Sequence, residues 1–181
     1  MLIIGLTGTL CSGKGEIGKY LAGKGFAYYS CSDELRREAR KLGLAETREN
    51  LGVVIGDKLR REFGKGVLGK RILEQILTDK KEMAIADSLR LIEEVNELKK
   101  SGNFKLVFVD APIEVRYKRC LERKRVTDDI SLEEFKKAEL LNVAAPGILA
   151  QIAADQNIPL VHLSTDYVFD GSKEYFIESD T

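Results

Sequence analysis

Short apolar runs alternate along this chain with segments in which apolar positions recur at helical spacing. Runs of this length are typical of buried strands in a parallel sheet. They predict strands at Leu2–Leu6, Phe26–Tyr29, Met83–Ala86, Lys105–Asp110 and Ile158–Leu163. Strands that alternate with helices predict an α/β fold, a doubly wound parallel sheet in a single domain.

The segments between the runs predict helices. In one of them Leu91, Ile92, Val95 and Leu98 share a face, and Gly102 ends it. Helices are expected at Glu16–Ala22, Glu34–Leu42, Thr47–Phe63, Val67–Leu77, Leu89–Lys100, Val115–Arg125, Leu132–Leu141 and Ile148–Ala154. Ser32 or Asp33 can cap the second of these helices.

Composition supports a folded protein of the cytoplasm. Apolar residues make up 44% and charged residues 32% of the 181 residues, enough for a core and a solvated surface. No apolar run reaches the roughly 18 residues of a membrane span, so we expect no membrane association. The three cysteines have no metal-ligand spacing, and their odd number suits a reducing compartment.

The total charge is balanced but unevenly spread. Lys+Arg and Asp+Glu both number 29, yet the last 41 residues hold only one basic residue and six acidic ones. The basic helix near Arg116–Arg125 has no aromatic platform interleaved with it, so we expect no nucleic acid partner. The shift in charge near Leu141 marks a change in the kind of sequence.

A glycine-rich motif directly follows the first predicted strand. Residues 8–14 read GTLCSGK, the pattern G-x-x-x-x-G-K, and a predicted helix comes next. Gly8 and Gly13 let the backbone turn its N–H groups inward, and the helix N-terminus adds to the field. Lys14 supplies a positive charge for the β and γ phosphates of a nucleotide. The alternative interpretation is a glycine-rich turn with a surface lysine.

One position departs from this pattern. The lysine is followed by Gly15 and Glu16, where such loops carry a Ser or Thr whose hydroxyl ligates Mg²⁺. Ser12, Glu16 or water would have to serve instead, so the anchoring of Mg²⁺ stays open.

Residues 29–36 (YSCSDELR) resemble the acceptor-site segment of the adenylate kinases. Together with the phosphate loop, this segment makes the chain resemble adenylate-kinase-like and dephospho-CoA-kinase-like P-loop proteins over about residues 1–140. The resemblance implies that Arg36 holds the acceptor phosphate and that Asp33 lies near the metal or the phosphates. Cys31 replaces the family's threonine, which makes AMP a less secure acceptor.

Two later segments extend the resemblance. Residues 87–90 (DSLR) stand where the group has Asp-Gly-Phe-Pro-Arg, which implies a metal role for Asp87 and a phosphate role for Arg90. Residues 109–112 (VDAP) precede a basic helix and resemble the strand and helix that lead into the kinase lid. By this match Asp110 faces the metal, and the lid-base arginines are Arg119 and Arg123.

Each of these residues also has a structural interpretation. Arg36 can belong to a solvated helix face, and Arg119 and Arg123 can pair with nearby acids. Asp33 can be only a helix cap, and Asp110 only a turn residue at the end of a strand.

A second resemblance begins near residue 142. Residues 142–171, with the run STDYVFDG at 164–171, are similar to the dTDP-4-dehydrorhamnose reductase family. The match implies that Thr165 is the hydroxyl of a Thr/Tyr/Lys set. However, Tyr175 is followed four residues later by Ser179 rather than lysine, and the N-terminus has no dinucleotide-binding G-x-G-x-x-G. We therefore expect no reductase activity.

The change in charge and the change in resemblance coincide. We interpret the chain as a chimera whose last helix–strand unit is Rossmann-like, with a natural kinase tail that drifted to this sequence as the alternative. The kinases' loop after the last strand often contacts adenine, which would place Gly171 and Ser172 at the base. Within the domain we expect acceptor-binding helices at about 34–80, a lid at about 113–139 and an atypical segment at about 141–181.

The resemblance implies a P-loop nucleotide-kinase-like protein that uses ATP and Mg²⁺. We expect it to transfer the γ-phosphate of ATP to a small phosphorylated acceptor, with a nucleotide favoured. Two alternatives stay open: an NTP-binding module or slow NTPase, and an inactive engineered chimera of two α/β folds. The acceptor's identity and the oligomeric state are not determined by the sequence.

Overall fold

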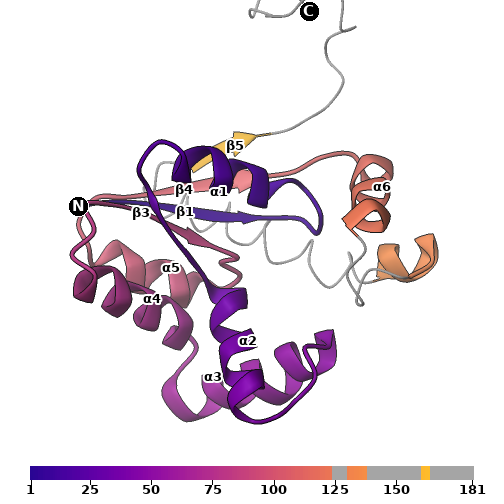
Figure 1. Ribbon diagram of the computed structural model, residues 1–181, viewed down its shortest axis with the longest axis horizontal. Helices are drawn as coiled ribbons and strands as arrows, with labels where there is room; N and C mark the ends of the chain where they lie inside the picture. Colours follow the sequence, from indigo (N-terminus) through magenta and orange to yellow (C-terminus); the bar gives the residue numbers. More distant parts are fainter. Residues whose placement is uncertain (124–129, 138–159, 164–181) are drawn as a thin grey trace, which may run out of the picture.

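Five parallel strands form one sheet at the centre of the molecule (Figure 1). The computed structural model describes residues 1–123, 130–137 and 160–163. The strands are β1 Leu2–Gly8, β2 Ala27–Ser30, β3 Met83–Asp87, β4 Phe104–Val109 and β5 Leu160–Leu163, in the order β2-β3-β1-β4-β5. All five strands were predicted, and the doubly wound α/β class is confirmed.

Helices connect the strands. They are α1 Lys14–Ala22, α2 Cys31–Lys41, α3 Asp57–Phe63, α4 Val67–Thr78, α5 Ile92–Lys99 and α6 Ile113–Arg123, with a π-helix η1 over Asn50–Gly56. In Figure 1, α4 and α5 lie together on one side of the sheet and α1 on the other, while α2 and α3 extend away from it. Residues 132–137 are also helical and form the described part of the helix expected at Leu132–Leu141.

The core lies where apolar strand faces meet α4 and α5. Ile3, Ala84 and Leu106 of three neighbouring strands are almost fully buried, together with Ile72 of α4 and Val95 of α5. Because parallel strands are covered by helices on both faces, their sequences read as nearly continuous apolar runs. This is why the strands could be located from the sequence.

The starts of two predicted helices were wrong by three residues. The helix expected at Glu34 begins at Cys31 with Ser30 as its N-cap residue, so neither Ser32 nor Asp33 caps it. The helix expected at Leu89 begins at Ile92, because Ser88 has a left-handed φ of 64° that delays the helix. In both places the chain leaves a strand and turns at once, which helical periodicity does not register.

The helix expected at Thr47–Phe63 is divided in two. Its first part is the π-helix η1, and only Asp57–Phe63 is α-helical. Residues 50–56 read NLGVVIG, and glycines and β-branched residues have low helix propensity. Long π-helical stretches are rare and are often found at functional sites.

The strand of the reductase-like segment joins the main sheet. β5 pairs in parallel with β4, with Leu106 opposite Leu160 and Val109 opposite Leu163. The expectation that this strand completes the kinase-like sheet is confirmed. The helix expected at Ile148–Ala154 lies outside the described residues.

Candidate functional site

The phosphate loop connects the end of β1 to the start of α1. Gly8 has φ 141° and Gly13 has φ 108°, and the non-glycine Cys11 also has a left-handed φ of 58°. A Cβ at Gly8 would lie 2.0 Å from the carbonyl oxygen of Val109 on β4, so only glycine fits there. Such alternating backbone conformations turn successive N–H groups to one side and build an anion-binding concavity.

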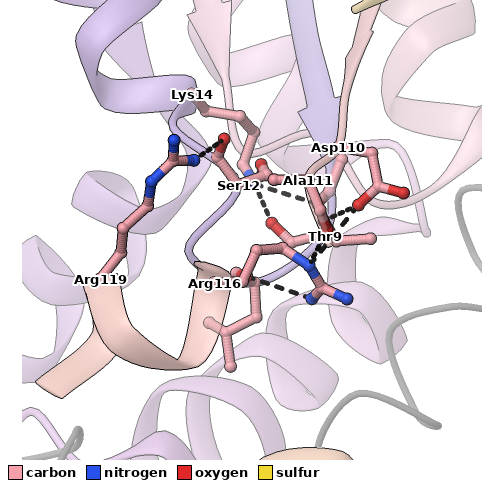
Figure 2. A network of polar contacts seen from close by, with 9 residues as sticks. Thr9, Ser12, Lys14, Asp110, Ala111, Arg116 and Arg119 are labelled. Carbon is pink, nitrogen blue, oxygen red and sulfur yellow. Dashed lines mark hydrogen bonds and ion pairs between the residues drawn. The ribbon is translucent and has the colours of Figure 1, made fainter. Parts of the chain in front are cut away.

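The Lys14 side chain folds back across this loop (Figure 2). Its Nζ donates to the carbonyl oxygens of Gly8 at 3.0 Å and Thr9 at 2.6 Å, and to Ser12 Oγ at 3.3 Å. Ser12 itself is buried. The structure thus brings Gly8, Ser12, Gly13 and Lys14 together, as expected, with the ammonium group at the mouth of the loop.

The two residues after the lysine do not approach the loop. Gly15 is exposed, and a Cβ there would meet no atom within 4 Å. Glu16 is exposed as well and its carboxylate pairs with Lys19 at 2.7 Å. Gly15, at the position that supplies a hydroxyl in other loops of this type, therefore has no side chain, although there is room for one.

The carboxyl end of β4 and helix α6 brace the loop from one side (Figure 2). Asp110 accepts a hydrogen bond from the Thr9 hydroxyl and lies 3.6 Å from Arg116 Nε. Arg116 is buried and donates to the carbonyl oxygens of Ala111 at 2.6 Å and Leu10 at 3.3 Å. Asp110 therefore lies beside the phosphate loop.

Two arginines one turn apart on α6 therefore reach the phosphate loop. Arg119 Nη1 donates to the carbonyl oxygen of Ser12 at 3.1 Å, and the preceding arginine, Arg116, bonds to Leu10 as described. Sequence reasoning chose Arg119 and passed over Arg116, although the spacing of three residues puts both on one helix face. Arg123, the last residue of α6, is exposed.

On the other side of β1, a tyrosine holds Asp87 at the end of β3. The Tyr28 hydroxyl donates to Asp87 Oδ2, and the Ser88 N–H donates to Asp87 Oδ1. Asp87 is buried with 6% exposure. Burial of the Tyr28 hydroxyl, the Asp87 carboxylate and its hydrogen bond, and more distantly Asp33, all raise the pKa of Tyr28 above its ordinary value.

The structure pairs two of the expected site residues with each other. Arg36 Nη1 lies 2.6 Å from Asp33 Oδ1, one turn away on α2, and Arg36 Nε lies 3.5 Å from Glu46 Oε2. Arg36 thus has two carboxylate partners and would have to exchange one of them to bind a phosphate.

Arg90 lies in a different environment, beside the buried Glu94. Its backbone N–H donates to Glu94 Oε2 at 2.9 Å. Arg90 as a whole is exposed to solvent, but the surroundings of its guanidinium lower its pKa, chiefly through burial. The negative charge of Glu94 raises this pKa, whereas the positive charges of Arg60 and Arg48 lower it further. Neither Glu94 nor Arg60 was singled out from the sequence, because nothing local distinguishes them from other helical charges.

The remaining expectations concern metal and the C-terminal loop. Across the described ranges, no three His, Cys, Asp or Glu side chains gather as a metal-holding group. No helix in the same ranges has the length and apolarity needed to cross a membrane. Gly171 and Ser172, expected at the adenine, lie outside the described residues.

Comparisons with known proteins show the family of this chain. The sequence profile of the AAA domain matches residues 4–142. A UPF0200 protein of Sulfurisphaera tokodaii is 36% identical over 138 residues, which cover 76% of this chain and 75% of the relative. The chain belongs to the AAA-domain family and to the UPF0200 proteins.

Two solved kinase structures share the fold of this UPF0200 chain. A sugar kinase from Janibacter aligns with a TM-score of 0.54 at 13% identity over 91% of this chain and 85% of its own. A gluconokinase from Sinorhizobium meliloti aligns with a TM-score of 0.51 at 15% identity over 90% and 82%. At such identities the likeness concerns the fold, and it confirms the kinase-like P-loop architecture.

The C-terminal part has a match of its own. The profile of the RmlD substrate binding domain matches residues 127–181, so it overlaps the AAA-domain match by a short stretch. The second sequence resemblance is thus found again in the same part of this UPF0200 chain.

Proposed function

We propose that this UPF0200 chain transfers the γ-phosphate of ATP to a small phosphorylated acceptor, with a nucleotide favoured, in the manner of adenylate-kinase-like proteins. The observation that carries the proposal is the pair of arginine groups that flank the phosphate loop. Arg116 and Arg119 of α6 bond to the loop itself. Arg90 follows β3, the strand that neighbours β1 on the opposite side.

Phosphoryl transfer suits such an arrangement. The reaction needs two phosphate groups held in line and cations around the transferring group rather than covalent catalysis. Lys14, Arg119 and Arg123 are proposed to meet the phosphates of ATP, and Arg36 and Arg90 those of the acceptor. Residues 34–80 would then form the acceptor-binding helices and residues 113–139 the lid.

The side chains present fit Mg²⁺ only in an indirect mode. Asp87 ends β3 and Asp110 follows β4, the two strands that flank β1. Gly15 brings no hydroxyl, while Mg²⁺ keeps several waters and accepts one or two carboxylates together with phosphate oxygens. Asp87 and Asp110 would hold the ion through water, with Asp33 more distant, and the ion would neutralise charge on the phosphates.

The test is ADP formation from Mg-ATP with a panel of nucleotides and dephospho-CoA as acceptors. We expect one acceptor to accelerate ADP formation saturably. The Lys14→Ala variant should lower this rate by roughly 100-fold or more, because it removes a charge from the transferring phosphates. Lys19→Ala, an exposed lysine of the same helix, is the matched control and should leave the rate unchanged.

The second candidate function is a nucleotide-binding module or slow NTPase. The absence of a hydroxyl at Gly15 favours it, because the ion would be held less firmly during transfer. ADP formation that depends on Lys14 but on none of the acceptors would support this function and rule out the kinase.

The third candidate is an inactive chimera of two α/β folds. The RmlD match over residues 127–181 and the acidic character of the same part favour it. In that case the chain would bind ATP no more tightly than inorganic tripolyphosphate, because the borrowed segment supplies no base contact.

A further inference from the structure

A single buried carboxylate connects three elements on the acceptor side of the molecule. Glu94 of α5 has 0% exposure. Its Oε2 accepts the backbone N–H groups of Arg90 at 2.9 Å and Leu91 at 3.2 Å, which fixes the start of α5. Its Oε1 accepts from Arg60 Nη2 of α3 at 3.2 Å. Glu94 thus fixes the Arg60 guanidinium and the backbone of Arg90.

Arg60 has donors that this carboxylate does not use. Its side chain is only 18% exposed, and its Nε is buried without a hydrogen-bond partner in the described structure. The nearest other carboxylate, Asp57, is 3.7 Å from Nη1. A guanidinium presents five N–H donors in a rigid fork, so a buried Nε–H without an acceptor is costly unless a ligand supplies one.

Arg90 has even fewer partners. Arg90 is exposed to solvent, and its guanidinium makes no hydrogen bond or ion pair with any residue in the described ranges, while the charges of Arg60 and Arg48 oppose its own. Two guanidinium groups therefore lie near the one buried carboxylate of Glu94, and the other carboxylate beside Arg60, that of Asp57, is exposed and 3.7 Å away.

The backbone next to Arg60 leaves room for this fork. A Cβ at Gly56 would lie 2.9 Å from Arg60 Nη1, so the glycine at the end of the π-helix η1 lets the guanidinium pass close to the main chain. Gly56 ends the π-helix at the point where α3 begins, a geometry that is frequent at functional sites.

We propose that Arg60 and Arg90 together form the binding site for the phosphomonoester dianion of the acceptor, with Glu94 as the residue that positions both. This proposal rests on the kinase function above and names Arg60 as an acceptor ligand beside Arg36 and Arg90. A dianion accepts several N–H donors at once and matches the arginine fork, which a singly charged carboxylate does less well.

The site can be read directly from the arginine Nε–H resonances in ¹H–¹⁵N spectra of the full chain. Inorganic phosphate is the probe, added at constant ionic strength. We expect the Arg60 and Arg90 resonances to shift saturably, because their N–H groups gain an acceptor. Arg61, the adjacent residue of α3, bonds to the Asp57 carbonyl oxygen and should not respond.

Substitution separates the ligand role from a structural one. Arg60→Lys keeps a charge opposite Glu94 but removes the fork, and should raise the KM for the acceptor roughly 10-fold or more with little change in kcat or Tm. Arg61→Lys is the matched control and should change neither. If Arg60→Lys does not fold, the double variant Arg60→Met with Glu94→Gln removes both charges, and its Arg90 resonance should no longer respond to phosphate.

Other outcomes overturn the proposal. If phosphate shifts only the backbone amides of the phosphate loop and leaves Arg60 and Arg90 unmoved, the cluster is structural. Kinase activity that is indifferent to Arg60→Lys would also refute the site while leaving the kinase function intact. A phosphate response at Arg60 and Arg90 without any acceptor-dependent ADP formation would refute the kinase function and leave the anion site.

Discussion

At the scale of single residues, the charged groups around the phosphate loop already have protein partners. Lys14 binds loop carbonyl oxygens, Asp110 is engaged by Thr9 and Arg116, and Asp87 accepts two hydrogen bonds. A nucleotide that binds here must therefore replace some of these hydrogen bonds and ion pairs. Ligand affinity will then depend on how firmly each partner is held.

Tyr28 gives a direct test of this dependence. Tyr28→Phe removes a hydrogen bond to the carboxylate of Asp87, and we expect it to lower the free energy of unfolding by roughly 1–2 kcal/mol. It should also change the Mg²⁺ dependence of ATP binding, measured by calorimetry with and without the ion. The control is Tyr29→Phe in the same strand, whose hydroxyl bonds to the exposed side of the molecule at Asp79. Equal effects of the two variants on Mg²⁺ dependence would contradict a role for Tyr28 in positioning Asp87.

The same tyrosines predict how stability changes at alkaline pH. The fold raises the pKa of Tyr28 above the value of 10.0, and it raises the pKa of Tyr29 to about 12, chiefly by burial and then through the neighbouring aspartates. The folded state thus favours the protonated phenols, so their contribution is complete below pH about 10 and is lost as pH rises above that value. In urea unfolding, the wild type should lose more stability between pH about 9 and 11 than the double variant with both tyrosines changed to Phe. Parallel pH curves would refute this.

At the scale of elements, α1 contains two glycines with opposite surroundings. A Cβ at Gly15 meets nothing within 4 Å, whereas a Cβ at Gly18 would lie 2.6 Å from Cε2 of the Tyr28 ring. Gly15→Ala should therefore stabilise the protein by about 0.5–1 kcal/mol, because alanine loses less backbone entropy in a helix. Gly18→Ala should destabilise it by roughly 1–3 kcal/mol through overpacking.

Denaturant unfolding of the two alanine variants checks this pair. Effects of the same sign would show that helix propensity dominates and that the contact between α1 and Tyr28 is loose. The expected opposite signs would also connect the helix of the phosphate loop to Asp87 through the tyrosine ring.

The elements themselves were predicted well from the sequence, with instructive exceptions. Strands such as β3 are buried on both faces, at Ala84, Ile85 and Ala86, and their apolar composition reveals them. The π-helix η1 was missed because its apolar residues repeat as they would in an α-helix. Helix starts at Cys31 and Ile92 were missed because turns without a helical signal precede them.

At the scale of the whole molecule, the sheet joins two kinds of sequence. β5 belongs to the part with RmlD similarity and pairs with β4 of the AAA-domain part. Parallel pairing depends on backbone hydrogen bonds and an apolar surface, which either family supplies. This is the physical reason that a borrowed or diverged unit can complete a kinase-like sheet.

Truncation tests the contribution of this unit. A chain that ends at residue 140 lacks β5 and leaves β4 as an exposed edge, so we expect a lower urea midpoint and a tendency to aggregate. A chain that ends at residue 163 keeps the strand and should match the full chain more closely. Equal midpoints for the two truncated chains would mean that β5 adds nothing to stability.

The sequence by itself determined the features that depend on neighbours along the chain. The apolar runs predicted the five strands, and the glycine spacing with Lys14 predicted the phosphate loop. These features can be predicted from the sequence because strand burial and loop geometry are set within a few consecutive residues.

Only the tertiary structure decided which distant side chains meet. The pairs Arg60–Glu94, Tyr28–Asp87 and Arg116–Leu10 are separated by 34, 59 and 106 residues. Their contact depends on the strand order β2-β3-β1-β4-β5, which brings the carboxyl ends of strands far apart in sequence to one edge of the sheet. No local pattern records that order, because it results from the packing of the whole sheet with its helices.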